Sequence, residues 1–386
     1  MQPKIIELND VLDYQQPTPY IVKSTDYMES GDIPVLTPGK TFILGYTKEK
    51  EGIFSGPFPV IIFDDFTTAT KLVNFPFKVK SSAMKILLPK SNADVKFIFY
   101  FLQTIHFQAD THKRYWISVC AKTKLALPPM AEQKRIVKKI EELFGVIDEQ
   151  VKRLEATHAA LVSYRQSVLT DCLRKAAGVS TTLGKTVKPR RERVTFNGTN
   201  GNMIFIGMDC IESNALKPHK TDLLRNTKST CFIFHKDDVL YGRMRSYLNK
   251  VFKAETNGAA SAEFIVFPPT KDILPDYLKY LLHQQDFVSF ATRNASGDRP
   301  RVKFEEDLAP FPFTLPSLPE QKAIVKKIEN AFAFADKAQA AITGALEQAK
   351  QLKQSILKRA FEGKLVPQDP NDKPVDLTQI KKDKHK

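Results

Sequence analysis

The chain has 386 residues, more than one ordinary domain uses, and its 42% hydrophobic and 26% charged residues exclude a disordered polymer. A formal net charge of +15 favours an anionic partner, because each Lys or Arg near a phosphate releases counterions, although charge alone also fits a generic basic protein. The first residues lack the pattern of a signal peptide, and no apolar run reaches the ~18 residues that a membrane span needs. We therefore expect a cytoplasmic protein with no membrane contact.

Cysteine usage gives no sign of a metal centre. The four cysteines lie far apart in the sequence and form no CxxC pair or Cys/His cluster. They are Cys120, Cys172, Cys210 and Cys231. We expect reduced, buried thiols and no bound metal.

Residues 1–126 have the composition of a mixed α/β domain. They are rich in proline, glycine and aromatic residues. Short apolar runs at 58–63 and 85–88 are bounded by turn-forming residues, which is typical of strands. An aromatic stretch predicts a short helix over 95–107.

Residues 127–180 predict the first of two long helices. Pro128 and Pro129 stop the preceding element, and Glu132 lies in the first turn, where the helix dipole favours a carboxylate. Apolar residues then recur every seven positions, which is the pattern of a coiled-coil seam. The seam residues are Ile140, Ile147, Leu154, Leu161 and Val168.

Residues 181–314 resemble the first segment in composition and in the order of their elements. Strand-like runs at 203–206, 238–241 and 264–267 precede a predicted helix over 274–290. We infer that 1–126 and 181–314 are two diverged copies of one fold.

Residues 315–386 repeat the long helix. Residues 127–141 read LPPMAEQKRIVKKIE and residues 315–329 read LPSLPEQKAIVKKIE, at a constant offset of 188 (321 minus 133 for the glutamines). The second seam comprises Ile328, Ala335, Ile342, Ala349 and Ile356. Separate amphipathic helices are the alternative, but a length of about 45 residues, against a mean of ~11–12, favours long paired helices. The predicted fold class is α+β.

Two variable domains that alternate with two similar helices, each opening with an LP…EQ..IV..I string, resemble the specificity (S) subunit of type I restriction–modification enzymes. The run QSILKRAFEGKLVP at 354–367 is also similar to this family. The resemblance implies an antiparallel coiled coil, pseudo-twofold symmetry and two target-recognition domains. At ~1.5 Å per residue, helices of about 45 residues are roughly 65–70 Å long and would space two readers of an asymmetric bipartite DNA site.

The same resemblance implies a chain that is not itself an enzyme. We find no phosphate loop, GxGxxG turn, HExxH motif or amino-methyltransferase motif. Asp64-Asp65 and Asp237-Asp238 fit turns better than a nuclease site. Modification subunits, of which we expect two, and restriction subunits would then bind the helices. S-adenosylmethionine, ATP and Mg²⁺ would bind those partners, and this chain would need no cofactor.

Residue chemistry suggests the DNA contacts, because Arg and Lys bind phosphates and Arg binds guanine in a bidentate manner. In the second domain the candidates are Arg190, Arg191, Arg193, Arg243, Arg245, Arg299 and Arg301. In the first domain they are Lys71, Lys78, Lys80, Lys113 and Arg114. Each of them could equally be a solvated surface charge. Tyr115 and Trp116 are either stacking residues or, more commonly for such residues, part of the core.

Two alternatives remain open at the level of the sequence. A stand-alone coiled-coil scaffold that binds RNA or protein would account for the repeat alone, whereas the motifs and the basic charge favour the specificity subunit. The specificity subunit of another multisubunit restriction enzyme would have the same sequence features.

Overall fold

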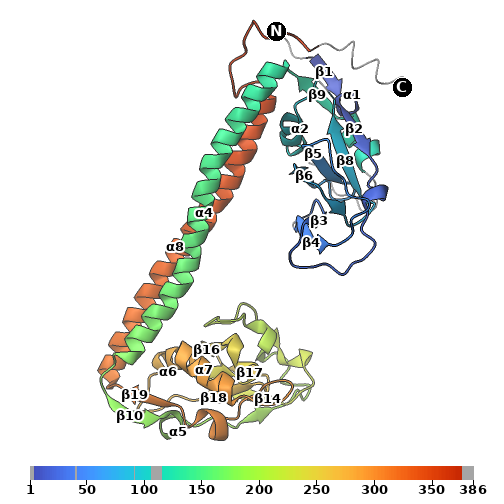
Figure 1. Cartoon of the computed structure of the whole chain (residues 1–386). Coiled ribbons are helices and arrows are strands. Elements are labelled where there is room, and N and C mark those ends of the chain that lie inside the picture. The colour runs from blue at the N-terminus through green and yellow to red at the C-terminus, as the bar shows by residue number, and fades with distance from the viewer. Residues whose placement is uncertain (1–3, 40, 91, 106–114, 376–386) are drawn as a thin grey trace. The chain divides into compact units, whose positions relative to one another are not determined.

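The computed structural model describes residues 4–39, 41–90, 92–105 and 115–375, and the chain divides into two compact units. Unit 1 comprises Met1–Arg153 and Gly344–Lys386, and unit 2 comprises Leu154–Thr343. Each unit contains one mixed α/β domain and part of both long helices, α4 (Met130–Arg174) and α8 (Leu318–Phe361) (Figure 1).

The domain of unit 1 contains two sheets. One has the strand order β2-β8-β5-β6 and the other β4-β3-β7, and β1 pairs antiparallel with β9. Its elements are β1 (Lys4–Glu7), α1 (Leu8–Val11), β2 (Leu12–Gln15), η1 (Thr18–Tyr20), β3 (Ile33–Leu36), β4 (Ile43–Thr47), β5 (Val60–Asp64), β6 (Thr70–Val73), β7 (Lys78–Val79), β8 (Met84–Pro89), α2 (Val95–Leu102), α3 (Tyr115–Ser118), η2 (Cys120–Lys122) and β9 (Lys124–Leu127).

The domain of unit 2 is built in the same way. Its sheets have the strand orders β11-β14-β17-β12-β13 and β16-β15-β18, and β10 pairs antiparallel with β19. Its elements are β10 (Val179–Thr182), α5 (Leu183–Thr186), β11 (Arg193–Val194), β12 (Ile204–Ile206), η3 (Met208–Cys210), β13 (Asp222–Leu223), η4 (Leu224–Asn226), β14 (Cys231–Phe234), β15 (Val239–Gly242), η5 (Ser246–Leu248), β16 (Val251–Lys253), β17 (Gly258–Ala260), β18 (Phe264–Phe267), α6 (Pro275–His283), α7 (Gln285–Asn294), η6 (Phe304–Leu308) and β19 (Pro312–Leu315).

Strand register confirms that the two domains are copies of one fold. In unit 1, Ile61 of β5 is opposite Leu87 of β8. In unit 2, Leu240 of β15 is opposite Val266 of β18. Each of the two strands in unit 2 follows its counterpart in unit 1 by the same 179 residues in the sequence (240 minus 61 and 266 minus 87). The antiparallel pair is therefore retained although the sequences have diverged.

The predicted helix over 274–290 is wrong in one respect, because the chain is broken there into α6 and α7. Gln284 is extended, with ψ 151°. The preceding carbonyl, that of His283, accepts a hydrogen bond of 2.9 Å from the side-chain amide of Asn249. In a continuous helix that carbonyl would accept from the N–H four residues later, so the bond from Asn249 in a distant loop stabilises the break. The helix predicted over 95–107 ends earlier, at Leu102, and residues 106 and 107 lie outside the described part of the chain.

The long helices pack against each other in antiparallel directions. In unit 1, Lys353 of α8 forms an ion pair with Asp148 of α4. In unit 2, Arg165 of α4 forms one with Asp336 of α8. Residues of increasing number in α4 therefore contact residues of decreasing number in α8, as in an antiparallel pair. All ten predicted seam residues are buried or half-buried, as a coiled-coil seam requires.

In each unit the domain is attached to the long helices by a buried glutamine. In unit 1, Gln133 is fully buried; its Oε1 accepts from the backbone N–H of Asp94, which caps α2, at 2.8 Å. Its Nε2 donates to the carbonyls of Asn92 at 3.2 Å and Pro128 at 2.9 Å. The repeat-related Gln321 makes the corresponding three bonds in unit 2.

An aromatic cluster reinforces this attachment in unit 1. Tyr100 of α2 meets Phe144 of α4 edge-on, with ring centroids 5.7 Å apart. The ammonium of Lys353 lies 5.0 Å from the Phe144 centroid. In unit 2 the equivalent cluster consists of Tyr280, Phe332 and Arg165. The repeat therefore preserves the contacts between domain and helix as well as the helix sequence.

Residues beyond α8 also pack within unit 1. Arg135, near the start of α4, donates two hydrogen bonds of 3.1 and 2.6 Å to the carboxylate of Asp372. Lys4 of β1 donates to the carbonyl of Val375 at 3.2 Å. The two ends of the described chain are therefore bonded into the same unit.

Candidate nucleic-acid interface

Backbone hydrogen bonds in unit 2 bring four of the predicted arginines together. The N–H of Val302 donates to the carbonyl of Arg243 at 3.0 Å, and the N–H of Arg245 donates to that of Pro300 at 2.8 Å. The loop after β15 consequently lies beside the segment that precedes η6. Arg243 and Arg245 on the first segment therefore lie close to Arg299 and Arg301 on the second.

These four arginines differ in how far their charge is already neutralised. Arg301 donates to both carboxylate oxygens of Glu263, at 2.8 to 3.2 Å, and this contact lowers the pKa of Glu263. Arg243 is half-buried, and its Nε has no partner among the described residues. Arg245 and Arg299 are exposed and have no acidic partner in the described part of the chain. The last two are thus the arginines most available to an external anion.

The loop after β15 is held in an unusual backbone conformation. Arg245 and Asn249 are both left-handed, with φ 53° and 48°, a region that non-glycine residues seldom adopt. The carbonyl of Arg245 accepts from the N–H of Leu248 at 2.8 Å, and the Asn249 side chain is bonded to His283. The loop is therefore fixed in shape, and between these two residues it presents Tyr247 with 52% of its surface exposed.

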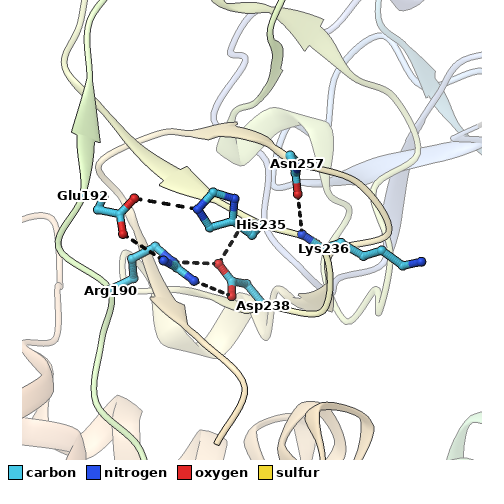
Figure 2. Close-up of polar contacts among 6 residues, drawn as sticks. All are labelled: Arg190, Glu192, His235, Lys236, Asp238 and Asn257. Carbon is cyan, nitrogen blue, oxygen red and sulfur yellow. Dashed lines mark hydrogen bonds and ion pairs between the residues drawn. The ribbon is translucent and has the colours of Figure 1, made fainter.

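Arg190 is engaged inside its own domain (Figure 2). Its Nε and Nη2 donate to the two carboxylate oxygens of the fully buried Asp238 at 3.0 and 3.2 Å, and Nη1 donates to Glu192 at 2.9 Å. Oδ2 of Asp238, which accepts from Nε of Arg190, also accepts from the backbone N–H of His235 at 2.8 Å. The geometry thus gives Arg190 a structural role and argues against it as a DNA contact.

The two neighbouring arginines are more accessible. Arg191 is exposed and forms an ion pair with Glu305, which is exposed as well. Arg193 is exposed, and its guanidinium lies 5.2 Å from the ring centroid of Phe232. Exposed ion pairs are weak, so both side chains remain available to a phosphate.

In unit 1 the structure argues against Lys78 as a DNA contact. Its side chain is 2% exposed, its Nζ lies 2.9 Å from Glu49, and it donates to the carbonyl of Glu51 at 2.6 Å. A buried ammonium requires such partners, and here they lie well before it in the sequence. Lys71 is half-buried on β6 and Lys80 is exposed. Lys113 and Arg114 lie outside the described residues.

Tyr115 and Trp116 belong to the core, the second of the two roles considered for them. Trp116 is buried, its ring centroid is 5.4 Å from that of Phe63, and its backbone N–H donates to Asp65 at 2.8 Å. Asp65 is also buried and lies 3.6 Å from Lys85. This aspartate therefore serves structure, as predicted for the paired aspartates.

The loop of unit 1 that is equivalent to the arginine loop also exposes an aromatic ring. The N–H of Asp65 donates to the carbonyl of Ala83, and its carbonyl accepts from the N–H of Tyr115. Arg243 makes a similar pair of bonds with Glu263 and Val302, one residue out of step with the 179-residue offset. The next residue, Phe66, is 44% exposed. Sequence patterns did not select Phe66 or Tyr247, although an aromatic residue within a polar turn is an unusual feature.

No group of three or more His, Cys, Asp or Glu side chains in the described residues could hold a metal ion. All four cysteines are free and buried. None of the helices in the described ranges combines the length and apolarity needed to cross a membrane.

Comparison with known proteins relates this arrangement to one family. The model of the type I restriction modification DNA specificity domain matches residues 3–156 and again 188–348. The EcoR124I/EcoR124II type I restriction enzyme specificity subunit of Escherichia coli is 30% identical over 355 residues, which cover 84% of this chain and 85% of the relative. The EcoDI specificity subunit of the same organism is 26% identical over 281 residues, 63% of each chain.

Two solved structures share the fold. One is a chain from a study of complex assembly and conformational transition of the type I R-M system, with a TM-score of 0.68 and 16% identity over 94% of this chain and 98% of that one. The other is the HsdS subunit from Thermoanaerobacter tengcongensis, with a TM-score of 0.52 and 17% identity over 94% of this chain and 97% of that one.

Proposed function

This chain belongs to the type I restriction–modification DNA specificity family, and from that premise we propose that it reads an asymmetric bipartite site, one half with each recognition domain. It is a DNA-recognition subunit and not an enzyme, and the alternative of an RNA- or protein-binding scaffold finds no support in these relatives. The observation that carries the proposal is the repetition of one domain fold with different loops, because different loops would read different bases. We assign the recognition domains to residues 1–126 and 181–314, and the helical spacers to 127–180 and 315–386.

The arginine loops of unit 2 supply the proposed DNA contacts. Exposed guanidinium groups without internal partners need not break an ion pair before they bind a phosphate or a guanine edge. Arg245 and Arg299 meet this condition best, with Arg243 beside them. Arg301, already bound to Glu263, would fix the shape of the loop. In unit 1, Lys80 is the described candidate with the greatest exposure.

Exposed apolar side chains on the long helices support two equivalent partner sites. In unit 2, Tyr164 and Phe334 are exposed, with ring centroids 6.4 Å apart. An offset of 188 residues relates them to Leu352 and Val146, both of which are exposed in unit 1 (352 minus 164 and 334 minus 146). An apolar surface built twice fits two copies of one partner. We propose that these are two modification subunits, that restriction subunits join them, and that S-adenosylmethionine, ATP and Mg²⁺ bind those partners.

Mapping DNA methylation tests the function. The chain is co-expressed with the methyltransferase subunit of its own system in a host lacking other adenine methylation, and methylated adenines are mapped across the host genome. We expect a single asymmetric motif of two half-sites with a fixed gap, absent without this chain. The double variant Arg245→Ala, Arg299→Ala should lose methylation, whereas Arg191→Ala should retain the motif. A motif that does not change when this chain is omitted would refute the function.

A further inference from the structure

We propose that Phe66 and Tyr247 are DNA wedges, aromatic side chains that insert between neighbouring base pairs, one in each half-site. The proposal rests on the proposed function, and it identifies how each recognition domain deforms its DNA.

The two rings lie in corresponding loops of the two domains. Phe66 lies in the loop from β5 to β6, and Tyr247 lies in the loop from β15 to β16. The strand pairs beside these loops have the same register. Each loop begins with a residue, Asp65 in unit 1 and Arg243 in unit 2, whose N–H donates to the residue just before β8 or β18. The carbonyl of the same residue accepts from the N–H of Tyr115 in unit 1 and of Val302 in unit 2. Both loops therefore expose an aromatic ring, one residue after Asp65 in unit 1 and four residues after Arg243 in unit 2, although the loops differ in length and sequence.

Both rings are carried by rigid backbone. The Asp64 carboxylate accepts from the N–H groups of Phe66 at 2.9 Å and Thr67 at 2.8 Å, which fixes a tight turn beneath the ring. Tyr247 lies in η5, which is bounded by the left-handed residues Arg245 and Asn249. Loops whose shape is fixed lose little entropy when a side chain is inserted into a ligand.

The surroundings identify the ligand as duplex DNA. Tyr247 is two residues from the exposed, unpaired Arg245, in the loop that lies beside Arg299. An apolar ring exposed to water beside phosphate-binding groups can insert between two base pairs of a bound duplex. Such a wedge unstacks one base step, so it favours DNA sequences in which that step unstacks easily.

Fluorescence of 2-aminopurine tests the proposal directly. Duplexes with the mapped site carry single 2-aminopurines away from the methylated adenines and are bound by the full chain with its methyltransferase subunits. The wild type should brighten one base step in each half-site. Phe66→Ala should abolish the signal in one half-site and Tyr247→Ala in the other, with affinity lowered roughly tenfold or more. Phe66→Tyr and Tyr247→Phe should retain both signals.

Salt dependence separates a wedge from a phosphate contact. The slope of log affinity against log salt should be unchanged in Phe66→Ala and Tyr247→Ala, whereas Arg245→Ala should reduce it by about 1. A wild-type complex that binds its site without brightening any step, or alanine variants that bind as tightly as the wild type, would overturn the wedge while leaving the proposed function intact. Failure of the proposed function is distinct, because the wild type would then show no site preference.

Discussion

Replacing Gln321 by alanine should loosen the attachment of the second domain to α8. The side chain is fully buried; Oε1 accepts from the N–H of Leu274 at 2.8 Å, and Nε2 donates to the carbonyls of Asp272 and Pro316, both at 2.9 Å. Three hydrogen bonds at about 1 kcal/mol each give a loss of about 3 kcal/mol for the unit.

Hydrogen exchange measured by mass spectrometry is the suitable assay, since it follows unit 2 separately from the rest of the chain. If exchange proceeds through opening of this contact, about 3 kcal/mol corresponds to roughly a hundredfold faster exchange in peptides covering α6. The matched control is Gln351→Ala, because Gln351 is exposed on the same helix with a single bond of 3.4 Å to Glu347. Gln321→Glu keeps the size of the side chain but turns a carboxylate oxygen toward two carbonyls, so it should destabilise the contact at least as much as Gln321→Ala does. Unchanged exchange in Gln321→Ala would refute the reasoning.

Three further predictions follow from the geometry. Burial lowers the pKa of His283 from 6.5 to about 4. The free energy of unfolding of unit 2 should therefore fall by about 3 kcal/mol between pH 6.5 and pH 4, because only the unfolded chain gains the proton in this range. A pH titration of stability in which His283→Asn has the same slope as the wild type would contradict this. Phe334→Glu and Val146→Glu, at positions 63% and 60% exposed, should each remove one methyltransferase subunit from the complex, and native mass spectrometry showing two in either variant would exclude the paired sites. Lys78→Met should cost unit 1 about 3 kcal/mol in a urea titration, because it removes the buried partner of Glu49, and it should leave the salt dependence of DNA binding unaltered. A changed salt slope would make Lys78 a DNA contact after all.

The long helices and their repeat could be predicted because their evidence is local and periodic. A seven-residue apolar pattern identifies the seam, and a closely similar string at a constant offset identifies the second copy. The shared Gln133 and Gln321 were visible in that string, but their purpose was not. Their partners, the starts of α2 and α6, lie well before them in the chain, and only the fold brings them together.

The site was less predictable because arginine and lysine look alike in sequence whether they are paired or free. Lys78 and Arg190 had the right chemistry for DNA, but Glu49 and Asp238, both remote in sequence, neutralise them inside the domain. Conversely, the composition of a polar turn conceals Phe66, whose exposure depends on the turn that Asp64 holds. The break after His283 could not be predicted for the same reason, since the side chain that stabilises it, Asn249, lies in a distant loop.

The division of the chain sets an order in which its parts can fold during synthesis. Unit 2 is one continuous stretch, Leu154–Thr343, and can complete its core as soon as that stretch has left the ribosome. Unit 1 begins at the first residue but needs Gly344–Lys386, because Ile356 and Leu357 share its core with Ile140, and because Asp372 pairs with Arg135. The domain that is translated first is therefore the one finished last, and until then its half of α4 exposes an apolar stripe that a chaperone would have to shield.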